Sequence, residues 1–152
     1  MKIEGVSESN WIIDIQVSMG SHFSTGTFAD EVKIITKIEF STITKYKKAH
    51  DNKNKISMFD LETIFNLERK DAMQIFSRLD LEGRGKISAL DMWGGFCLAC
   101  SGINSDKIAF LSTLAVGRDG YINEAEATLV MHSACRGLAR LRLKGVKEPS
   151  MK

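Results

Sequence analysis

A short motif recurs along this chain. The segment KISMFD at residues 55–60 returns as KISALD at residues 86–91, 31 residues later, and more loosely as YINEAE at residues 121–126, 35 residues further on. Repetition at such a period indicates one supersecondary unit that is used several times. Ahead of the second copy, apolar residues follow the i, i+3, i+4, i+7 spacing of one helix face, namely Ala72, Ile75, Phe76 and Leu79. The repeat therefore predicts a series of helical units.

The composition allows an architecture made only of helices. Apolar residues make up 43% of the 152 residues and charged residues 26%, which is typical of a soluble globular chain with one domain or two small lobes. The single proline, Pro149, stands near the C-terminus, so no proline interrupts a helix in the body of the chain. We therefore expect the all-α class.

Several classes of protein are disfavoured. A net charge of +2 is too small to indicate a nucleic-acid-binding surface. The longest apolar stretch, residues 92–100, is far shorter than the roughly 18 residues that cross a bilayer, and residues 1–10 do not have the pattern of a secretory signal. An odd count of three cysteines favours free thiols in a reducing compartment, so we expect a cytoplasmic protein. No nucleophile–base pattern, phosphate loop or catalytic carboxylate pair stands out, which predicts a protein that is not an enzyme.

The second copy belongs to a longer segment with a definite order. Asp80 opens the segment, Gly85 allows a sharp turn, Ile87 supplies an aliphatic side chain and Asp91 closes it. Ser88 stands three residues before Asp91, which is a capping-box arrangement at a helix N-terminus. The other copies repeat this arrangement as Ser57 with Asp60 and as Asn123 with Glu126.

This order resembles the EF-hand, in which two helices flank a twelve-residue loop. The resemblance covers about residues 28–140 and implies three loops, at residues 49–60, 80–91 and 115–126 (loops one, two and three). Residues 1–27 form an N-terminal segment that is either a strand or the entering helix of a decayed hand. The rest divides into residues 28–66, 67–102 and 103–144, which are the first, second and third hands, and a tail at residues 145–152.

The aliphatic loop residues predict how the hands pair. In paired EF-hands these residues meet in a short β-bridge, and the 35-residue spacing of Ile87 and Ile122 suits such a pair better than the 31-residue spacing of Ile56 and Ile87. We therefore expect EF-hand helix-loop-helix repeats with one paired lobe, made by the second and third hands, plus an additional N-terminal hand. The helix that enters this first hand is expected to begin near Asp30, with Phe28, Val32, Ile35 and Ile38 along its face.

The resemblance implies oxygen ligands for calcium at loop positions 1, 3, 5, 9 and 12 and a main-chain carbonyl at position 7. The candidate ligands are Asp80, Glu82, Lys86, Ser88 and Asp91 in loop two and, more weakly, Asp119, Tyr121, Asn123 and Glu126 in loop three. Loop one retains Asp51, Ser57 and Asp60, with Asn54 at the turn position, because asparagine tolerates a left-handed backbone.

Each loop departs from the family's ligand pattern. Loop one has Ala49 and Lys53 at positions 1 and 5, loop two has Arg84 at position 5, and loop three has Ala115 and Gly117 at positions 1 and 3. A lost carboxylate removes a ligand, and an added cation repels the ion. Asp91 is also one methylene shorter than the usual closing glutamate. We expect at most weak Ca²⁺ or Mg²⁺ binding at residues 80–91 and none in the other loops, which then serve as folding elements.

Apolar and basic side chains that follow the loops form candidate partner-binding surfaces. They are Met92, Trp93, Phe96, Leu129, Val130 and Met131, together with Arg136, Arg140 and Arg142 of a long basic C-terminal helix. In this family such apolar residues receive an amphipathic target helix, but they can equally fill the core of a closed lobe. The basic helix can bind an acidic surface, or its cations simply suit a helix C-terminus. A zinc site from Cys97, Cys100, His132 and Cys135 is a weaker alternative.

The sequence favours a non-catalytic protein that serves as a protein-binding adaptor or structural subunit, with weak or lost calcium binding, in the cytoplasm or on a cytoskeletal assembly. Its expected protein partner presents an amphipathic helix or an acidic surface, and a dimer or larger assembly stays open. The main alternative is a calcium-sensing, calmodulin-like regulator that binds target helices when calcium is present. A regulatory fragment of a larger enzyme is a third hypothesis.

Overall fold

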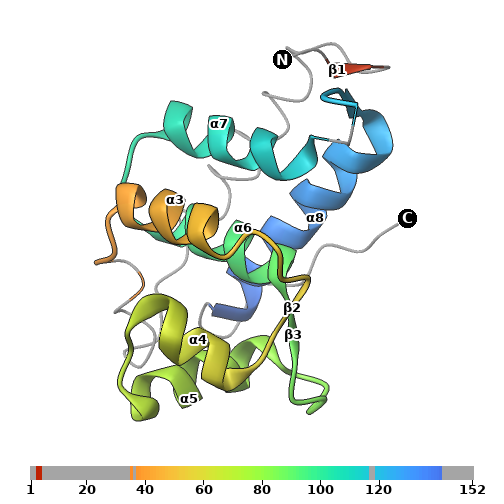
Figure 1. The fold of residues 1–152 in the computed structure, drawn as a ribbon. Coiled ribbons are helices and arrows are strands. Elements are labelled where there is room, and N and C mark those ends of the chain that lie inside the picture. The colour runs from red at the N-terminus through yellow and green to blue at the C-terminus, as the bar shows by residue number, and fades with distance from the viewer. Residues whose placement is uncertain (1–2, 5–34, 36, 117–118, 142–152) are drawn as a thin grey trace.

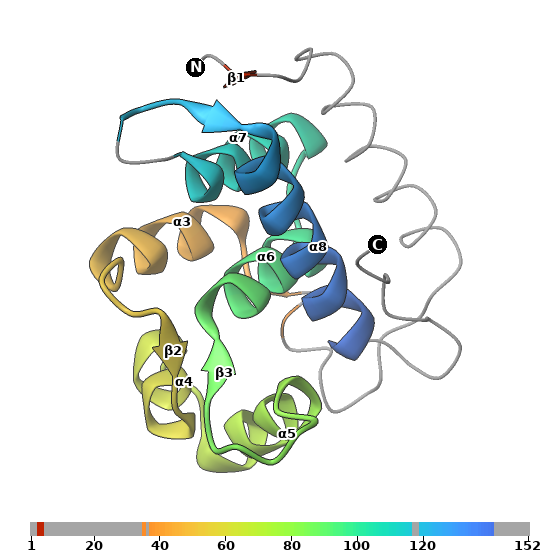
Figure 2. The same cartoon turned by 90° about the vertical axis from the view of Figure 1, so that its right-hand side faces the viewer.

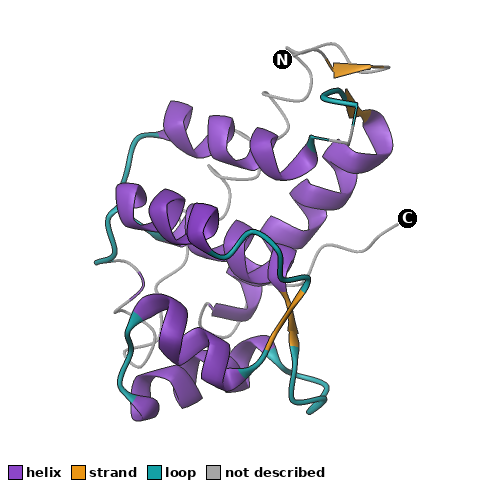
Figure 3. Ribbon diagram, in the orientation of Figure 1, coloured by secondary structure: helices purple, strands orange, loops and turns teal. Residues whose placement is uncertain are grey.

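The all-α class is confirmed. A computed structural model of the chain describes residues 3–4, 35, 37–116 and 119–141, and most of these residues are helical (Figures 1 and 3). The described helices are α3 (Phe40–Ala49), α4 (Met58–Phe65), α5 (Arg69–Leu79), α6 (Ala89–Ala99), α7 (Asn104–Ala115) and α8 (Glu124–Leu141). Within the described ranges, none of the helices has the length and apolar character that crossing a membrane requires.

The described residues include four two-residue strands. They are β1 (Ile3–Glu4), β2 (Lys55–Ile56), β3 (Ile87–Ser88) and β4 (Ile122–Asn123). Strands β2 and β3 pair in antiparallel fashion with Ile56 opposite Ile87, whereas β4 pairs in parallel with β1, with Ile122 opposite Ile3. The predicted pairing of Ile87 with Ile122 is therefore wrong. The first and second units form the paired lobe, and the third unit is the additional one.

The packing of α8 against α6 explains this outcome. A Cβ atom added at Gly94 would lie 2.6 Å from the Cα of Ala134, and one added at Gly95 would lie 2.8 Å from the carbonyl carbon of Gly137. A Cβ at Gly137 would overlap the main-chain oxygen of Asp91. Asp91 precedes Gly94 on α6, whereas its neighbour Gly137 follows Ala134 on α8, so the two helices are antiparallel and the C-terminal half of α8 lies beside loop two (Figure 2). Ile122 precedes Gly137 by 15 residues, which places loop three about 22 Å away along the helix.

The glycine pair inside α6 lies against a close neighbour, the main chain of α8. Residues 91–100 are all buried, so α6 is enclosed on every side. Phe65 of α4 packs on the same helix, with ring centroids 5.6 Å from Trp93 and 4.8 Å from Phe96. Helix α6 is thus the centre of the described fold, and loops one and two lie at its N-terminal end.

The helix that enters loop one is shorter than predicted. It begins at Phe40 rather than near Asp30, because Glu39 has an extended backbone and forms an isolated β-bridge with Ser101. The Phe40 amide donates to the Ser101 carbonyl oxygen at 3.2 Å. Ile35 is buried and Ile38 is half-buried. The predictions for Phe28, Asp30 and Val32, for the tail at residues 145–152, and for residues 1–27 apart from β1 lie outside the described residues.

Candidate functional site

The backbone at loop position 6 is left-handed, as the sequence predicts, in two of the three loops. Gly85 and Gly120 have positive φ values of +72° and +81°, as a sharp turn at loop position 6 requires. Asn54 does not adopt the predicted left-handed backbone, since Asn66 is the single described non-glycine residue with positive φ. The Asn54 carbonyl oxygen instead accepts a hydrogen bond from the Ala89 amide at 3.0 Å. Loop one is therefore shaped by its contact with the second unit rather than by a tight turn of its own.

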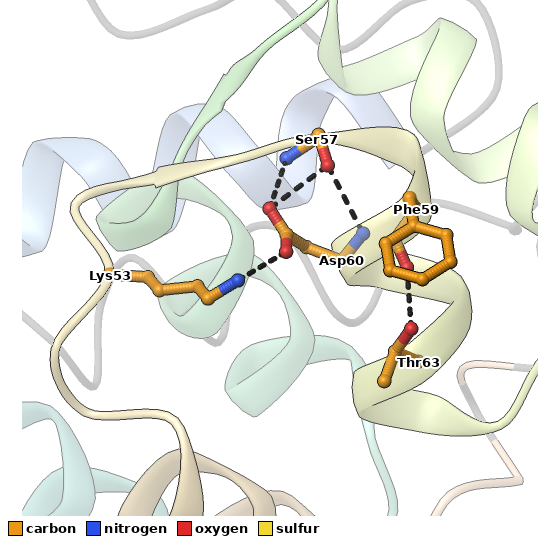
Figure 4. Close-up of polar contacts among 5 residues, drawn as sticks. All are labelled: Lys53, Ser57, Phe59, Asp60 and Thr63. Atoms are coloured by element: carbon orange, nitrogen blue, oxygen red, sulfur yellow. Dashed lines mark hydrogen bonds and ion pairs between the residues drawn. The ribbon is translucent and has the colours of Figure 1, made fainter.

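Loop one closes on a complete capping box and a lysine (Figure 4). The Asp60 amide donates to Ser57 Oγ at 3.2 Å, and the Ser57 amide donates to Asp60 Oδ2 at 2.9 Å. Lys53 Nζ donates to the other oxygen, Oδ1. Burial by itself raises the pKa of Asp60, but the hydrogen bonds from Lys53 and Ser57 outweigh it, so the pKa lies below its usual value. The ammonium at loop position 5 thus neutralises the carboxylate at position 12.

Loop two uses its first carboxylates within the loop. Asp80 accepts hydrogen bonds from the main-chain amides of Arg84, at 2.9 Å, and Gly85, at 2.8 Å. The Arg84 side chain forms an ion pair with Glu82, with 2.7 Å between Nε and Oε2. The hydrogen bonds of Asp80 shape the turn, and the ion pair with Arg84 neutralises Glu82 at position 3. Both carboxylates are therefore already bound to other groups of the loop.

The closing carboxylate of loop two is buried under α8. Asp91 is 5% exposed, and its Oδ2 lies 3.2 Å from Arg136 Nε and 3.7 Å from Arg140 Nη1. Arg140 Nη1 also donates to the Leu79 carbonyl oxygen at 3.0 Å. The Arg136 contact is an ion pair without hydrogen-bond alignment, and Oδ1 has no hydrogen-bond partner in the described part of the chain. The Asp91 amide donates to Ser88 Oγ at 3.5 Å, so only this half of the predicted capping box forms.

Loop three closes on a capping box alone. The Glu126 amide donates to Asn123 Oδ1 at 2.8 Å, and the Asn123 amide donates to Glu126 Oε2 at 3.4 Å. Asp119 Oδ1 accepts from the Tyr121 amide at 3.1 Å. Ala115, at position 1, is a buried methyl group that cannot coordinate an ion. Gly117 lies outside the described residues. Loop three thus keeps its helix start and offers few ligands.

These donor sets do not fit a calcium ion. Calcium takes six to eight oxygens, including both oxygens of the closing carboxylate. Across residues 3–4, 35, 37–116 and 119–141, no three His, Cys, Asp or Glu side chains come together in a way that could hold a metal ion. Lysine or arginine side chains contact the closing carboxylates of loops one and two. Lys86 is exposed in loop two and is not among the groups that contact Asp91.

The zinc alternative is not supported by the cysteine environment. Cys97, Cys100 and Cys135 are buried, and within the described residues they do not join His132 in a metal-binding group. Burial raises the pKa of Cys97 and Cys100, which keeps both as thiols. Zinc takes the thiolate form.

Lys107 is a polar residue that the sequence did not single out. It is 2% exposed, and its Nζ donates to the carbonyl oxygens of Leu98, at 3.2 Å, and Cys100, at 2.6 Å. Burial lowers the pKa of this amine. A helix leaves its last carbonyl groups without partners inside the helix, and Lys107 of α7 satisfies them for α6. Nothing in the local pattern around residue 107 distinguishes this lysine from an exposed one.

The predicted apolar partner surface is mostly interior. Met92, Trp93, Phe96 and Val130 are buried, Met131 is half-buried, and Leu129 is 44% exposed. In this conformation the first four fill the core, which was the alternative use of these residues. Arg136 and Arg140 fold back onto Asp91, and Arg142 lies outside the described residues.

Comparisons of the chain with protein-family models, curated proteins and solved structures found no match. The functional hypothesis below therefore depends on the geometry of the loops.

Proposed function

We propose that this chain is a degenerate EF-hand protein that serves as a non-catalytic adaptor or structural subunit and holds its fold without calcium. The observation that carries the proposal is the use of the closing carboxylates. Lys53 neutralises Asp60, and Arg136 and Arg140 neutralise Asp91. Basic side chains of the chain itself thus take the electrostatic role that a bound cation has in the family.

The internal cations oppose calcium directly. A calcium ion in loop two would need Asp91, and would therefore have to displace a half-buried guanidinium from it. Two unit charges of the same sign 4 Å apart repel by about 4 kcal/mol at an effective dielectric constant of about 20. Arg84 at position 5 adds a second repulsive charge beside the ion. A divalent ion would carry this cost before it gained any ligand.

The buried state of the expected groove favours an adaptor role over a sensor. A calcium sensor opens when the ion binds, which exposes an apolar groove. Here four of the six residues expected to line that groove are buried, and α6 is tied to α8 by the ion pairs of Asp91. Partner binding should therefore be constitutive. An odd count of three cysteines, all of them buried, suits a reducing compartment, so we propose the cytoplasm as the setting.

Calcium titration of the full chain tests the metal-independent fold. We expect no binding heat in calorimetry and the same thermal unfolding midpoint in calcium and in EDTA. A dissociation constant near micromolar, or a midpoint that rises with calcium, would replace this proposal with the calcium-sensor alternative.

Rebuilding loop two tests the EF-hand assignment separately. Arg84→Asp with Asp91→Glu places an acid at position 5 and the usual glutamate at position 12 of a loop that already has Asp80 and a left-handed Gly85. We expect this variant to gain calcium binding in the micromolar to millimolar range. The matched control is Lys86→Asp with Asp91→Glu, which makes the same charge change at position 7, where the main chain is the ligand. A rebuilt loop that binds no better than the control would contradict the assignment.

A further inference from the structure

A polar pocket lies between loop two and the C-terminal half of α8. Its volume is about 290 Å³, which is close to the lower end of the range for small-molecule sites, about 300 Å³. Loop two and β2 line one side of the pocket, and α8 lines the other. Most of the lining residues carry a charge, so the pocket suits a charged ligand.

The charges around this pocket leave an excess of positive charge. The cations are Lys55, Arg84, Lys86, Arg136 and Arg140, and the acids are Asp80, Glu82 and Asp91, which gives an excess of two positive charges. Arg84 pairs with Glu82, and two arginines share the single carboxylate of Asp91. Neither Lys55 nor Lys86 forms an ion pair with another described residue. The sign of the pocket therefore favours an anion.

The pairing of β2 with β3 brings the two lysines close together. Lys55 lies opposite Ser88, and Lys86 stands two residues before Ser88, at the diagonal position. Side chains at diagonal positions of a strand pair are about 7–8 Å apart, so two long side chains can meet on one ligand. Ile56 and Ile87, which alternate with them along the strands, are buried on the other face. Both lysines are exposed and line the pocket.

Arg136 supplies a further donor group on the α8 side. A guanidinium carries its N–H donors in a planar fork that matches the oxygens of a phosphate group. Within the described residues, Arg136 Nη2 donates to Ser133 Oγ at 3.4 Å, while Nε lies 3.2 Å from Asp91 Oδ2 without hydrogen-bond alignment. The side chain is 30% exposed. Its contacts with the protein therefore leave this guanidinium accessible and only partly satisfied.

We propose that the pocket between loop two and α8 binds a phosphate group, carried by inorganic phosphate or by a small phosphate ester. The two lysines and Arg136 would each contact its oxygens. The volume corresponds to about ten water molecules, which leaves room for a few atoms beyond the phosphate group. The ligand thus has the opposite charge to the calcium ion that such loops bind in the family. This inference goes beyond the proposed adaptor function and does not depend on it.

Calorimetric titration of the full chain with inorganic phosphate, and separately with glycerol 3-phosphate, tests the proposal. Both titrations are made in EDTA, with sodium chloride keeping the ionic strength constant. We expect phosphate to bind above the chloride background. Tighter binding of the ester would identify a phosphate ester as the ligand, and weaker or equal binding would identify inorganic phosphate. The double variant Lys55→Gln with Lys86→Gln should bind about tenfold more weakly, since it removes two exposed ion pairs.

The matched control is Lys45→Gln with Lys70→Gln, which removes the same charge from exposed helical lysines outside the pocket. Its affinity should stay within about twofold of the parent, and circular dichroism checks that both variants fold. Thermal unfolding is a second readout. Phosphate stabilises any protein to some extent because it is excluded from the surface, but specific binding adds a rise that the parent and the control share and the double variant lacks.

The proposal is overturned if neither phosphate nor the ester binds above the chloride background, or if the double variant binds as tightly as the parent. It is also overturned if the control loses as much affinity as the double variant, because the overall charge of the chain would then explain the effect. Calcium is chelated throughout, so a negative result here leaves the outcome of the calcium titration unchanged.

Discussion

Replacement of Asp91 by alanine is the sharpest test of the internal cations. Breaking a buried ion pair from one side costs about 3–5 kcal/mol, because the remaining charge stays buried without its counter-ion. In this chain the Arg136 side chain is 30% exposed and that of Arg140 is 15% exposed. Arg140 also keeps its hydrogen bond to the Leu79 carbonyl oxygen. We therefore expect a smaller loss, of about 2–3 kcal/mol in the free energy of unfolding.

Asp60→Ala is the matched comparison, because Asp60 closes loop one as Asp91 closes loop two. Its loss removes a capping-box acid, worth about 1 kcal/mol, and a partly exposed ion pair with Lys53, worth at most about 1 kcal/mol. Asp91→Ala should therefore be clearly the more destabilising change. Urea denaturation at neutral pH in EDTA measures both, with a shift in the transition midpoint and an unchanged slope.

The partner of Asp91 is identified by double-mutant cycles with Arg136→Ala and Arg140→Ala. Residues in direct contact show coupling energies of about 0.5–3 kcal/mol, and we expect coupling in this range with at least one arginine. The reasoning fails if Asp91→Ala costs no more than Asp60→Ala, or if neither arginine is coupled to Asp91. It also fails if calcium raises the midpoint of the parent but not of Asp91→Ala, since Asp91 would then be a metal ligand.

Three further predictions concern the glycine contact, the thiols and the acid stability. Gly137→Ala should cost about 3 kcal/mol in thermal unfolding, because the new methyl overlaps the Asp91 carbonyl oxygen, while Thr128→Ala on the exposed face of α8 should stay within about 0.5 kcal/mol. Native Cys97 and Cys100 should resist iodoacetamide at pH 8 and react only on unfolding, as mass spectrometry would show, because burial raises their pKa and the thiolate is the reactive form; rapid native labelling would contradict this. Because the pKa of Asp60 is lowered in the folded state, its contribution is complete above the unfolded value of about 3.9 and is lost as the pH falls through the folded pKa. Asp60→Asn should therefore flatten the loss of stability below about pH 4, and an unchanged acid limb in denaturation curves would refute the assignment.

Features that depend on nearby residues could be predicted from the sequence. The caps at Ser57 and Asn123 form because each partner acid stands three residues further along the chain. Gly85 and Gly120 adopt positive φ because the turn needs a residue without a Cβ atom. The ion pairs of the Asp91 carboxylate could not be predicted, because the two arginines that contact it lie 45 and 49 residues away in α8.

The strand pairing also could not be predicted from the sequence. Spacing alone made Ile122 the better partner for Ile87, but spacing carries no information about how helices cross. The close contact of Gly94 and Gly95 with Ala134 and Gly137 decides the matter. The two glycines of α6 stand together in the sequence, but the sequence does not show which helix they contact. The entering helix was likewise placed too early, because the bridge at Glu39 is made with Ser101 in a distant part of the chain.

An acid at loop position 12 has two separable roles in this fold. At a helix N-terminus it caps the main chain, as Asp60 and Glu126 do, and this role requires no metal. Position 5 has no such capping role, and there loops one and two have Lys53 and Arg84. A carboxylate at position 1 indicates a metal site only where it has no other partner. Asp80 has other partners, since it accepts hydrogen bonds from the amides of Arg84 and Gly85. Asp60, Asp80 and Glu126, which help to make these loops look like calcium sites, are therefore acids that the helix starts and the turn require in any case.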